Sequence, residues 1–166
     1  MNEQSQTIFF PVSRFKLFVM SIVTFGFYQL FWFYKNWQLL KAEDESNISP
    51  FWRTVFGTLY CYPLLAKIKN WAKSRSVYAN FSPLWLTVAW IGIIVFCRNL
   101  PIPYRLAGLL SVIALLPVQK SVNELNNLMV PYHDPNSRFS LWNIAAIAVG
   151  GGIIVLAIVG ILMPPT

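Results

Sequence analysis

The last apolar stretch of the chain constrains its fold more than any other feature. It runs from Leu141 to Met163 and contains no charged side chain. A helix of about 20 residues is long enough to cross the roughly 30 Å of hydrocarbon in a bilayer. The whole chain has the same bias, since only 11% of its 166 residues are charged and 56% are hydrophobic, whereas about 25% are charged in an average soluble domain. We therefore expect an all-α, polytopic helical membrane protein, with residues 1–166 as a single membrane domain and residues 141–163 as its C-terminal span.

Four shorter apolar stretches precede the last one, and two of them have a recognisable helix start. Ser49 and Ser82 are each followed directly by a proline, so that a capping serine stands before a proline at the first helical position. The number of spans ranges from three to five, depending on which of these stretches cross. The four stretches are Leu17–Tyr34, Phe51–Ala66, Leu84–Cys97 and Tyr104–Val118.

The middle of the chain, residues 83–118, predicts a helical hairpin. Its two apolar runs are joined by the tight loop RNLPIP. Residues 119–140 then predict a cytoplasmic extension of the second helix followed by a loop, because apolar residues recur there at helical spacing. We expect the polar side chains between them, including Asn123 and Asn126, to form a solvated helix face.

Residues 50–75 predict an aromatic helix with a basic end, which either lies at the membrane interface or spans the bilayer. Arg53 and Pro63 make a spanning helix costly, since an arginine at the centre of a span costs about 2.5–3.5 kcal/mol on insertion scales. Tryptophan prefers headgroup depth, and a basic side chain near an anionic surface contributes about 1 kcal/mol. We therefore predict lipid-headgroup contact by Lys67, Lys69, Lys73, Arg75, Trp52 and Trp71.

Residues 17–40 follow an N-terminal tail of residues 1–16 and form either a first apolar helix or a re-entrant pair. A full crossing is the favoured interpretation. In the alternative, Gly26 closes a short helix in a left-handed conformation and the chain returns as a second helix, shielded from lipid by its neighbours. In each case the distribution of lysine and arginine predicts that residues 67–75 and 120–138 are cytoplasmic and that the C-terminus is periplasmic.

Several segments together resemble a family of small multi-pass bacterial membrane proteins to which no activity is attributed. The most specific segment is TFGFYQLFWFYKNW, which begins at Thr24. It is followed by ISPFWR, NELNNL, HDPNSRF and WN, so the resemblance extends from about Ser13 to Gly152. It implies a bacterial inner (cytoplasmic) membrane and supplies no catalytic residue.

Small residues in the last stretch predict a helix-packing face. Ala146 and Gly150, and likewise Ala148 and Gly152, stand four residues apart, a spacing that lets another helix approach closely. Contact within one chain and contact between two copies both remain open. The glycine run is not read as a nucleotide-binding loop, because an apolar helix surrounds it and no strand precedes it.

Residues able to support catalysis or metal binding are sparse. His133 is the only histidine, and with Asp134 beside it a metal ion would still lack a third ligand. Cys61 and Cys97 have no metal-binding spacing. We expect no catalytic residue, no cofactor and no metal site.

These observations favour a non-enzymatic integral inner-membrane protein that organises lipid or a partner protein at the cytoplasmic face. Its expected partners are membrane lipid and, as further candidates, another membrane protein or a second copy of itself. Nucleic acid is not expected, because the basic residues behind the net charge of +7 stand at the ends of apolar runs. The alternative is a small oligomeric transporter or channel lined by Gln29, Thr87 and Ser111.

Overall fold

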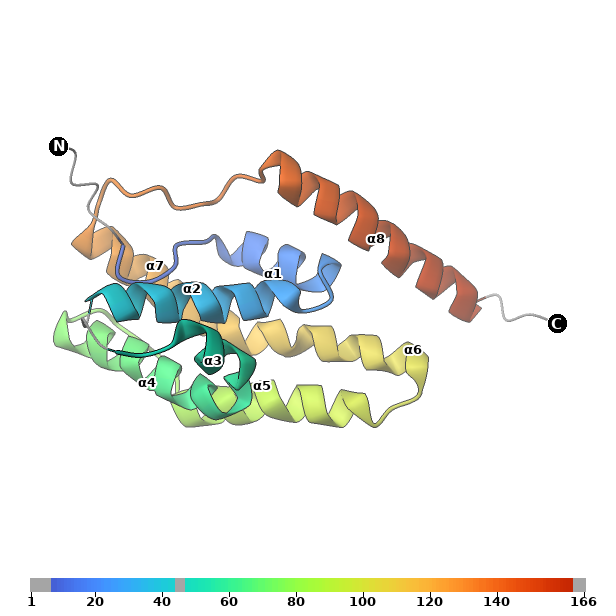
Figure 1. The fold of residues 1–166 in the computed structure, drawn as a ribbon, viewed down its shortest axis with the longest axis horizontal. Coiled ribbons are helices and arrows are strands. Elements are labelled where there is room, and N and C mark those ends of the chain that lie inside the picture. Colours follow the sequence, from blue (N-terminus) through green and yellow to red (C-terminus); the bar gives the residue numbers. More distant parts are fainter. Residues whose placement is uncertain (1–6, 44–46, 163–166) are drawn as a thin grey trace.

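The computed structural model describes residues 7–43 and 47–162, and each regular element in this part of the chain is helical (Figure 1). The prediction of an all-α fold is thus confirmed. The elements are α1 (Arg14–Val23), α2 (Phe27–Glu43), α3 (Pro50–Val55), α4 (Gly57–Ser74), α5 (Pro83–Arg98), α6 (Ile102–Arg105), the 3₁₀ segment η1 (Leu106–Leu115), α7 (Leu116–Met129) and α8 (Leu141–Leu162).

The first apolar stretch is a pair of helices joined by a tight turn. α1 ends at Val23 after 10 residues, and α2 runs back beside it (Figure 1). Phe25 and Gly26 have φ angles of 53° and 88°, in the left-handed region that reverses a chain after a helix. A 10-residue helix is about 15 Å long, about half the hydrocarbon thickness. The favoured single crossing helix is therefore wrong, and the alternative of two short helices is present.

Residues 50–75 also form two helices, which meet at Phe56. α3 has 6 residues, and α4 has 18 residues with Pro63 inside it. A single spanning helix over this range is not found. The predicted helix starts are confirmed, because Ser49 and Ser82 are the N-caps of α3 and α5.

α5 and the helix that follows it lie side by side and antiparallel (Figure 1). α6, η1 and α7 continue one another from Ile102 to Met129, and the change from 3₁₀ to α geometry falls at Leu116, just before Pro117. α8 lies apart from these helices and packs mainly on α1 (Figure 1).

Two helices in the described part of the chain are long and apolar enough to cross a membrane. They are Leu106–Met129, with a mean hydropathy of 1.4, and Leu141–Gly160, with a mean hydropathy of 2.3. α5 has only 16 residues, about 24 Å of helix. By length and composition, these two helices are candidate spans, fewer than the three to five spans predicted.

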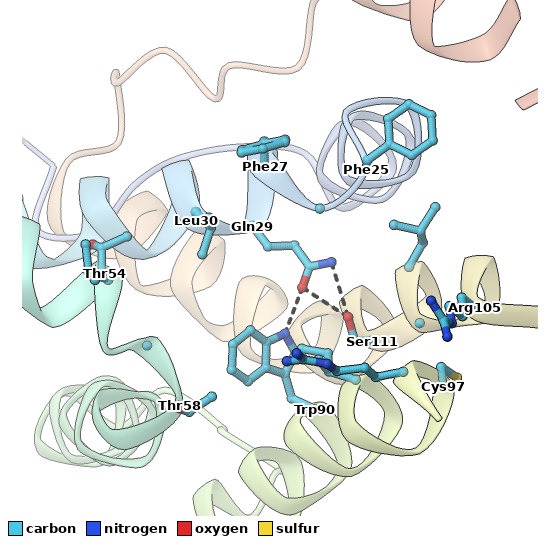
Figure 2. A pocket seen from close by; sticks show the side chains of 17 residues that line it. Phe25, Phe27, Gln29, Leu30, Thr54, Thr58, Trp90, Cys97, Arg105 and Ser111 are labelled. Atoms are coloured by element: carbon cyan, nitrogen blue, oxygen red, sulfur yellow. Dashed lines mark hydrogen bonds between the residues drawn. The ribbon is translucent and has the colours of Figure 1, made fainter. Parts of the chain in front are cut away.

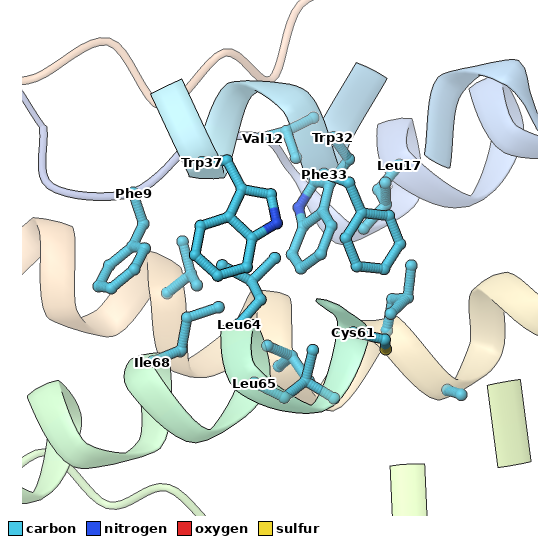
Figure 3. Packing of buried hydrophobic residues seen from close by; sticks show 14 of the residues in the cluster. Phe9, Val12, Leu17, Trp32, Phe33, Trp37, Cys61, Leu64, Leu65 and Ile68 are labelled. Atoms are coloured by element: carbon cyan, nitrogen blue, oxygen red, sulfur yellow. The ribbon is translucent and has the colours of Figure 1, made fainter. Parts of the chain in front are cut away.

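The core lies between α2, α4 and α7 and is rich in aromatic side chains (Figure 3). Trp32, Phe33 and Trp37 on α2 have no exposed surface, and they pack with Leu64 and Ile68 of α4. Full burial of a large apolar side chain contributes about 1.5–3 kcal/mol. The aromatic residues of the segment after Thr24 therefore hold the bundle together.

An extended N-terminal segment, Ile8–Val12, is inserted between α2 and α7 and held there by side-chain amides. The Asn126 amide bonds both backbone groups of Phe9, accepting from N (3.4 Å) and donating to O (2.8 Å). Asn123 donates to the carbonyl of Val12 at 3.0 Å. The predicted solvated face is therefore wrong for Asn123 and Asn126, because their amides replace the partners that a buried extended segment would otherwise lack. Three further amides also bind this segment, on Asn36, Gln119 and Asn136.

Candidate functional site

Three exposed aromatic side chains on α3 and at its end form what we call the aromatic surface. The rings of Phe51 and Trp52 meet edge to face with centroids 5.3 Å apart, and those of Trp52 and Phe56 stack at 6.0 Å. Their exposed fractions are 58%, 57% and 48%. Contiguous apolar exposure of this kind is typical of a contact with protein or membrane. The predicted headgroup residue Trp52 is the middle member of this surface.

The predicted basic residues follow along the second half of α4. Lys73 is exposed, whereas Lys67 is half-buried. Lys69 donates to a backbone carbonyl in the loop before α5 at 2.7 Å. The guanidinium of Arg75 lies 4.1 Å from the centre of the Trp71 ring, a cation–π contact worth about 0.5–1 kcal/mol at an exposed site. The structure thus brings Trp71 and Arg75 together and leaves Lys73 as the basic side chain most open to a headgroup.

A cavity of about 560 Å³ opens where the α1–α2 turn, the α3–α4 junction, α5 and η1 converge (Figure 2). Three glycines form part of its wall: Gly26, Gly57 and Gly108. An added Cβ would meet nothing within 4 Å at Gly26, and a tryptophan ring at 3.9 Å at Gly57. The space therefore exists partly because these positions carry no side chain.

A cluster of three polar side chains lies at the buried side of this cavity (Figure 2). Trp90 Nε1 donates to Gln29 Oε1 at 2.7 Å, and Ser111 Oγ lies 3.3 Å from both Oε1 and Nε2 of Gln29. The exposed fractions of Gln29, Trp90 and Ser111 are 4%, 4% and 1%. The structure thus joins two of the three predicted lining residues. The third, Thr87, instead donates to Cys61 Sγ at 3.6 Å and does not belong to the cavity wall.

Two exposed arginines, Arg98 and Arg105, belong to the same wall. Arg105 Nε donates to the carbonyl of Leu100 at 2.9 Å. Among the residues that the structure describes, no acidic side chain lines the cavity, and the sequence has none between Glu45 and Glu124. The cavity therefore combines apolar walls with an uncompensated positive charge.

The predicted packing residues of α8 fall on different sides of the helix. Gly150 is buried against α1, where a Cβ would lie 1.8 Å from the carbonyl oxygen of Val23. Ala146 is half-buried, whereas Ala148 and Gly152 are exposed. The Ala146 and Gly150 side therefore makes a contact within the chain, and the Ala148 and Gly152 side is open.

The loop after α7 is tied to α1 through Lys16. Its Nζ donates to Asn136 Oδ1 and to the carbonyl of Arg138, both at 2.7 Å. Burial lowers the pKa of Lys16, and the nearby Asp134 carboxylate raises it in part. His133 contacts the carbonyl of Val130 through Nδ1 at 2.7 Å and acts as a turn residue.

Sequence reasoning missed three members of the cavity: Trp90, Arg98 and Arg105. Trp90 is one of seven tryptophans, and its position in an apolar run does not distinguish it. The two arginines did carry a signal, because they flank the only tight loop between two apolar runs. That signal was interpreted only as a count of basic residues on one side of the membrane.

The fold and the cavity define a small, all-helical protein with two candidate membrane spans and an apolar, arginine-flanked pocket. Within the residues that the structure describes, no group of three histidine, cysteine, aspartate or glutamate side chains is arranged to hold a metal ion. Comparison with protein-family models, curated proteins and solved structures finds no match to this chain.

Proposed function

We propose that the chain is a non-enzymatic integral protein of the bacterial inner membrane that organises lipid at its cytoplasmic face. One observation carries this proposal: the Leu141–Gly160 span has a mean hydropathy of 2.3, and only 6% of it is buried within the molecule. Side chains such as Trp142 and Leu156 are 85% and 72% exposed. Water would disfavour such a surface by about 25 cal/mol for each Å², whereas hydrocarbon would not.

We propose three crossings, by α5, by the continuous helix of η1 and α7, and by α8. The α1–α2 and α3–α4 pairs enter from the cytoplasmic side and return, and the C-terminus is periplasmic. The distribution of charge supports this arrangement. The basic end of α4 lies at the opposite end of the bundle from the loop between α5 and α6, which Arg98 and Arg105 flank (Figure 1). The resemblance to small multi-pass bacterial membrane proteins also supports it.

In this arrangement Lys73, near the end of α4, contacts the headgroups of the cytoplasmic leaflet. The aromatic surface lies at the other end of α4, where the α3–α4 pair turns back, and faces the interior of the bilayer. One lysine near an anionic surface contributes about 1 kcal/mol. That free energy corresponds to about a fivefold preference for anionic lipid. Through this preference the protein enriches anionic lipid around itself.

The preference can be measured with spin-labelled lipids in nanodiscs that contain the full chain. We expect the protein to immobilise more phosphatidylglycerol than phosphatidylcholine, and Lys73→Gln to reduce that preference up to fivefold. Lys120→Gln is the matched control, because this substitution removes the same charge from another exposed side chain. Lys120 is on α7 and is paired with Glu124 at 3.8 Å. An equal reduction by both variants would assign the preference to net charge and would count against the proposed surface. Release of the protein from membranes by alkaline carbonate would refute membrane integration itself.

A small oligomeric transporter or channel is the second candidate, favoured by the meeting of Gln29 and Ser111 in the cavity. These side chains meet inside one chain and not between protomers. Ion or solute flux in proteoliposomes, together with a stable oligomer in detergent, would support this candidate. A monomer without flux would exclude it.

A further inference from the structure

We infer that the cavity at the α1–α2 turn binds one acyl chain of an anionic bilayer phospholipid, whose phosphate lies between Arg98 and Arg105. This inference rests on the proposed membrane location and assigns a second lipid site, at the opposite end of the bundle from the basic end of α4. Four features of the cavity support it: its size, its opening, its charge and the state of its buried polar groups.

The size and lining of the cavity match a ligand and not a trapped water. Its volume of about 560 Å³ falls within the range of about 300–1,000 Å³ that ligand pockets occupy. Leu30, Val55 and Ile94 give it apolar walls. An acyl chain is an apolar ligand that this volume accommodates, whereas the volume would hold only part of a complete phospholipid.

The edge of the cavity consists of exposed apolar side chains. Phe27 is 72% exposed, Val55 55% and Leu30 41%, and all three also line the cavity. Figure 2 shows Phe27 and Leu30 on the α2 side and Thr58 across from them on α4. In the proposed orientation these residues face hydrocarbon, so that a chain reaches the cavity from the bilayer without crossing water.

The charge of the wall selects an anionic headgroup. Arg98 ends α5 and Arg105 ends α6, on either side of the connecting loop. Within residues 7–43 and 47–162, no acidic side chain lines the cavity to neutralise them. Arginine binds phosphate through a planar fork of N–H donors, often with two parallel bonds. A phosphate at this position would lie at the interface while its acyl chain occupies the apolar cavity.

The buried polar groups do not require a polar ligand. Gln29, Trp90 and Ser111 bond to one another, and none of their buried atoms lacks a partner. A buried polar group that lacked a hydrogen-bond partner and was covered by an apolar chain would weaken binding of that chain by about 1–3 kcal/mol. Because this cluster is satisfied internally, methylene groups can lie against it without that cost.

Cys97 provides a native reporter, because it lines the cavity and only 6% of its surface is exposed. Cys61 is the internal control, since it is fully buried and does not line the cavity. The experiment measures alkylation of each cysteine by N-ethylmaleimide, using peptide mass spectrometry on the full chain in nanodiscs. One set of nanodiscs contains phosphatidylcholine alone, and the other contains about 30% phosphatidylglycerol.

We expect phosphatidylglycerol to slow alkylation of Cys97 at least fivefold and to leave Cys61 unmodified in both discs. The double variant Arg98→Gln, Arg105→Gln should abolish the difference, and the matching double lysine variant should restore part of it. Removal of two charges at the other lipid site, by Lys73→Gln and Arg75→Gln, should leave the protection of Cys97 intact. Because the bilayer charge is the same for every variant, a change of local pH cannot produce this pattern.

Three outcomes would overturn the inference: equal alkylation of Cys97 in both discs, protection that survives the glutamine variant, or protection only when free oleate is added to phosphatidylcholine discs. The last result would assign the cavity to a free fatty acid. Native mass spectrometry gives a second measurement, in which one phosphatidylglycerol should stay bound to the wild-type chain and be lost from the glutamine variant. Failure of the proposed membrane location is distinguishable, because the protein would then not enter nanodiscs and would be released by carbonate.

Discussion

The contact between Gly150 and Val23 gives the sharpest prediction of this structure. A Cβ at position 150 would lie 1.8 Å from the Val23 carbonyl oxygen and 2.8 Å from its carbonyl carbon. Both are backbone atoms of α1, so no side chain can rotate away. Gly150→Ala must therefore push α8 away from the end of α1.

The size of the effect follows from the geometry. Ordinary contact for a Cβ begins above 3.0–3.4 Å, so α8 has to move by about 1.2–1.6 Å relative to Val23. Overpacking of this kind costs about 1–3 kcal/mol, and in a protein of 150–250 residues each kcal/mol lowers Tm by about 2–4 °C. The expected decrease is about 2–12 °C. The remaining helices should keep their structure, because only 6% of the α8 span is buried within the molecule.

Thermal unfolding in detergent, followed by size-exclusion chromatography after heating, measures this decrease. Gly151→Ala is the matched control, since a Cβ at position 151 meets nothing within 4 Å. An alanine there should raise Tm or leave it unchanged, because glycine in a helix interior is up to about 1 kcal/mol less favourable than alanine. If both variants had the same Tm, the close contact between Gly150 of α8 and Val23 of α1 would be refuted.

Three further predictions concern the interior of the bundle. Asn126→Leu leaves both backbone groups of Phe9 without their partner and should destabilise the chain by at least about 2 kcal/mol. The destabilisation is measured as a lower Tm and as faster proteolysis of the N-terminal segment. Gln29→Leu removes the acceptor of a buried indole N–H and should cost about 1–3 kcal/mol; an unchanged Tm would show that the cavity cluster is not formed. Cys61 should stay unmodified by N-ethylmaleimide at pH 8 while Cys97 reacts, because Cys61 is fully buried and burial raises its pKa to about 11; faster reaction of Cys61 would contradict its place in the core.

The sequence predicted the elements better than their connections. Helix starts at Ser49 and Ser82 follow from local capping chemistry, which a sequence displays directly. The break at Gly26 was recognised but ranked second, because a hydropathy window does not register a single left-handed residue. Only the backbone at Phe25 and Gly26 decides between one helix and two.

The errors at Asn123 and Asn126 have a different cause. Polar residues on one side of an amphipathic helix normally face water, and the segment that they bind lies more than 100 residues away in the chain. The Gln29 and Ser111 pair is likewise 82 residues apart. Both were named as polar residues of interest, yet their neighbours in space could not be derived from local pattern.

The segments that carry the family resemblance have a structural use in this fold. In TFGFYQLFWFYKNW, Gly26 turns the chain and Trp32, Asn36 and Trp37 are fully buried, while in NELNNL the Asn126 side chain holds Phe9. Because these residues stabilise the helix bundle, a resemblance based on them indicates a shared fold and gives no information about a ligand.

The cavity shares only residues between Phe25 and Leu30 with those segments. Its other polar and charged members lie outside them and include Thr54, Thr58, Trp90, Arg98, Arg105 and Ser111. Variants within the motifs should therefore change stability first. Variants at Arg98 and Arg105, which are exposed and do not belong to the hydrophobic core, are the ones whose effects would report on binding.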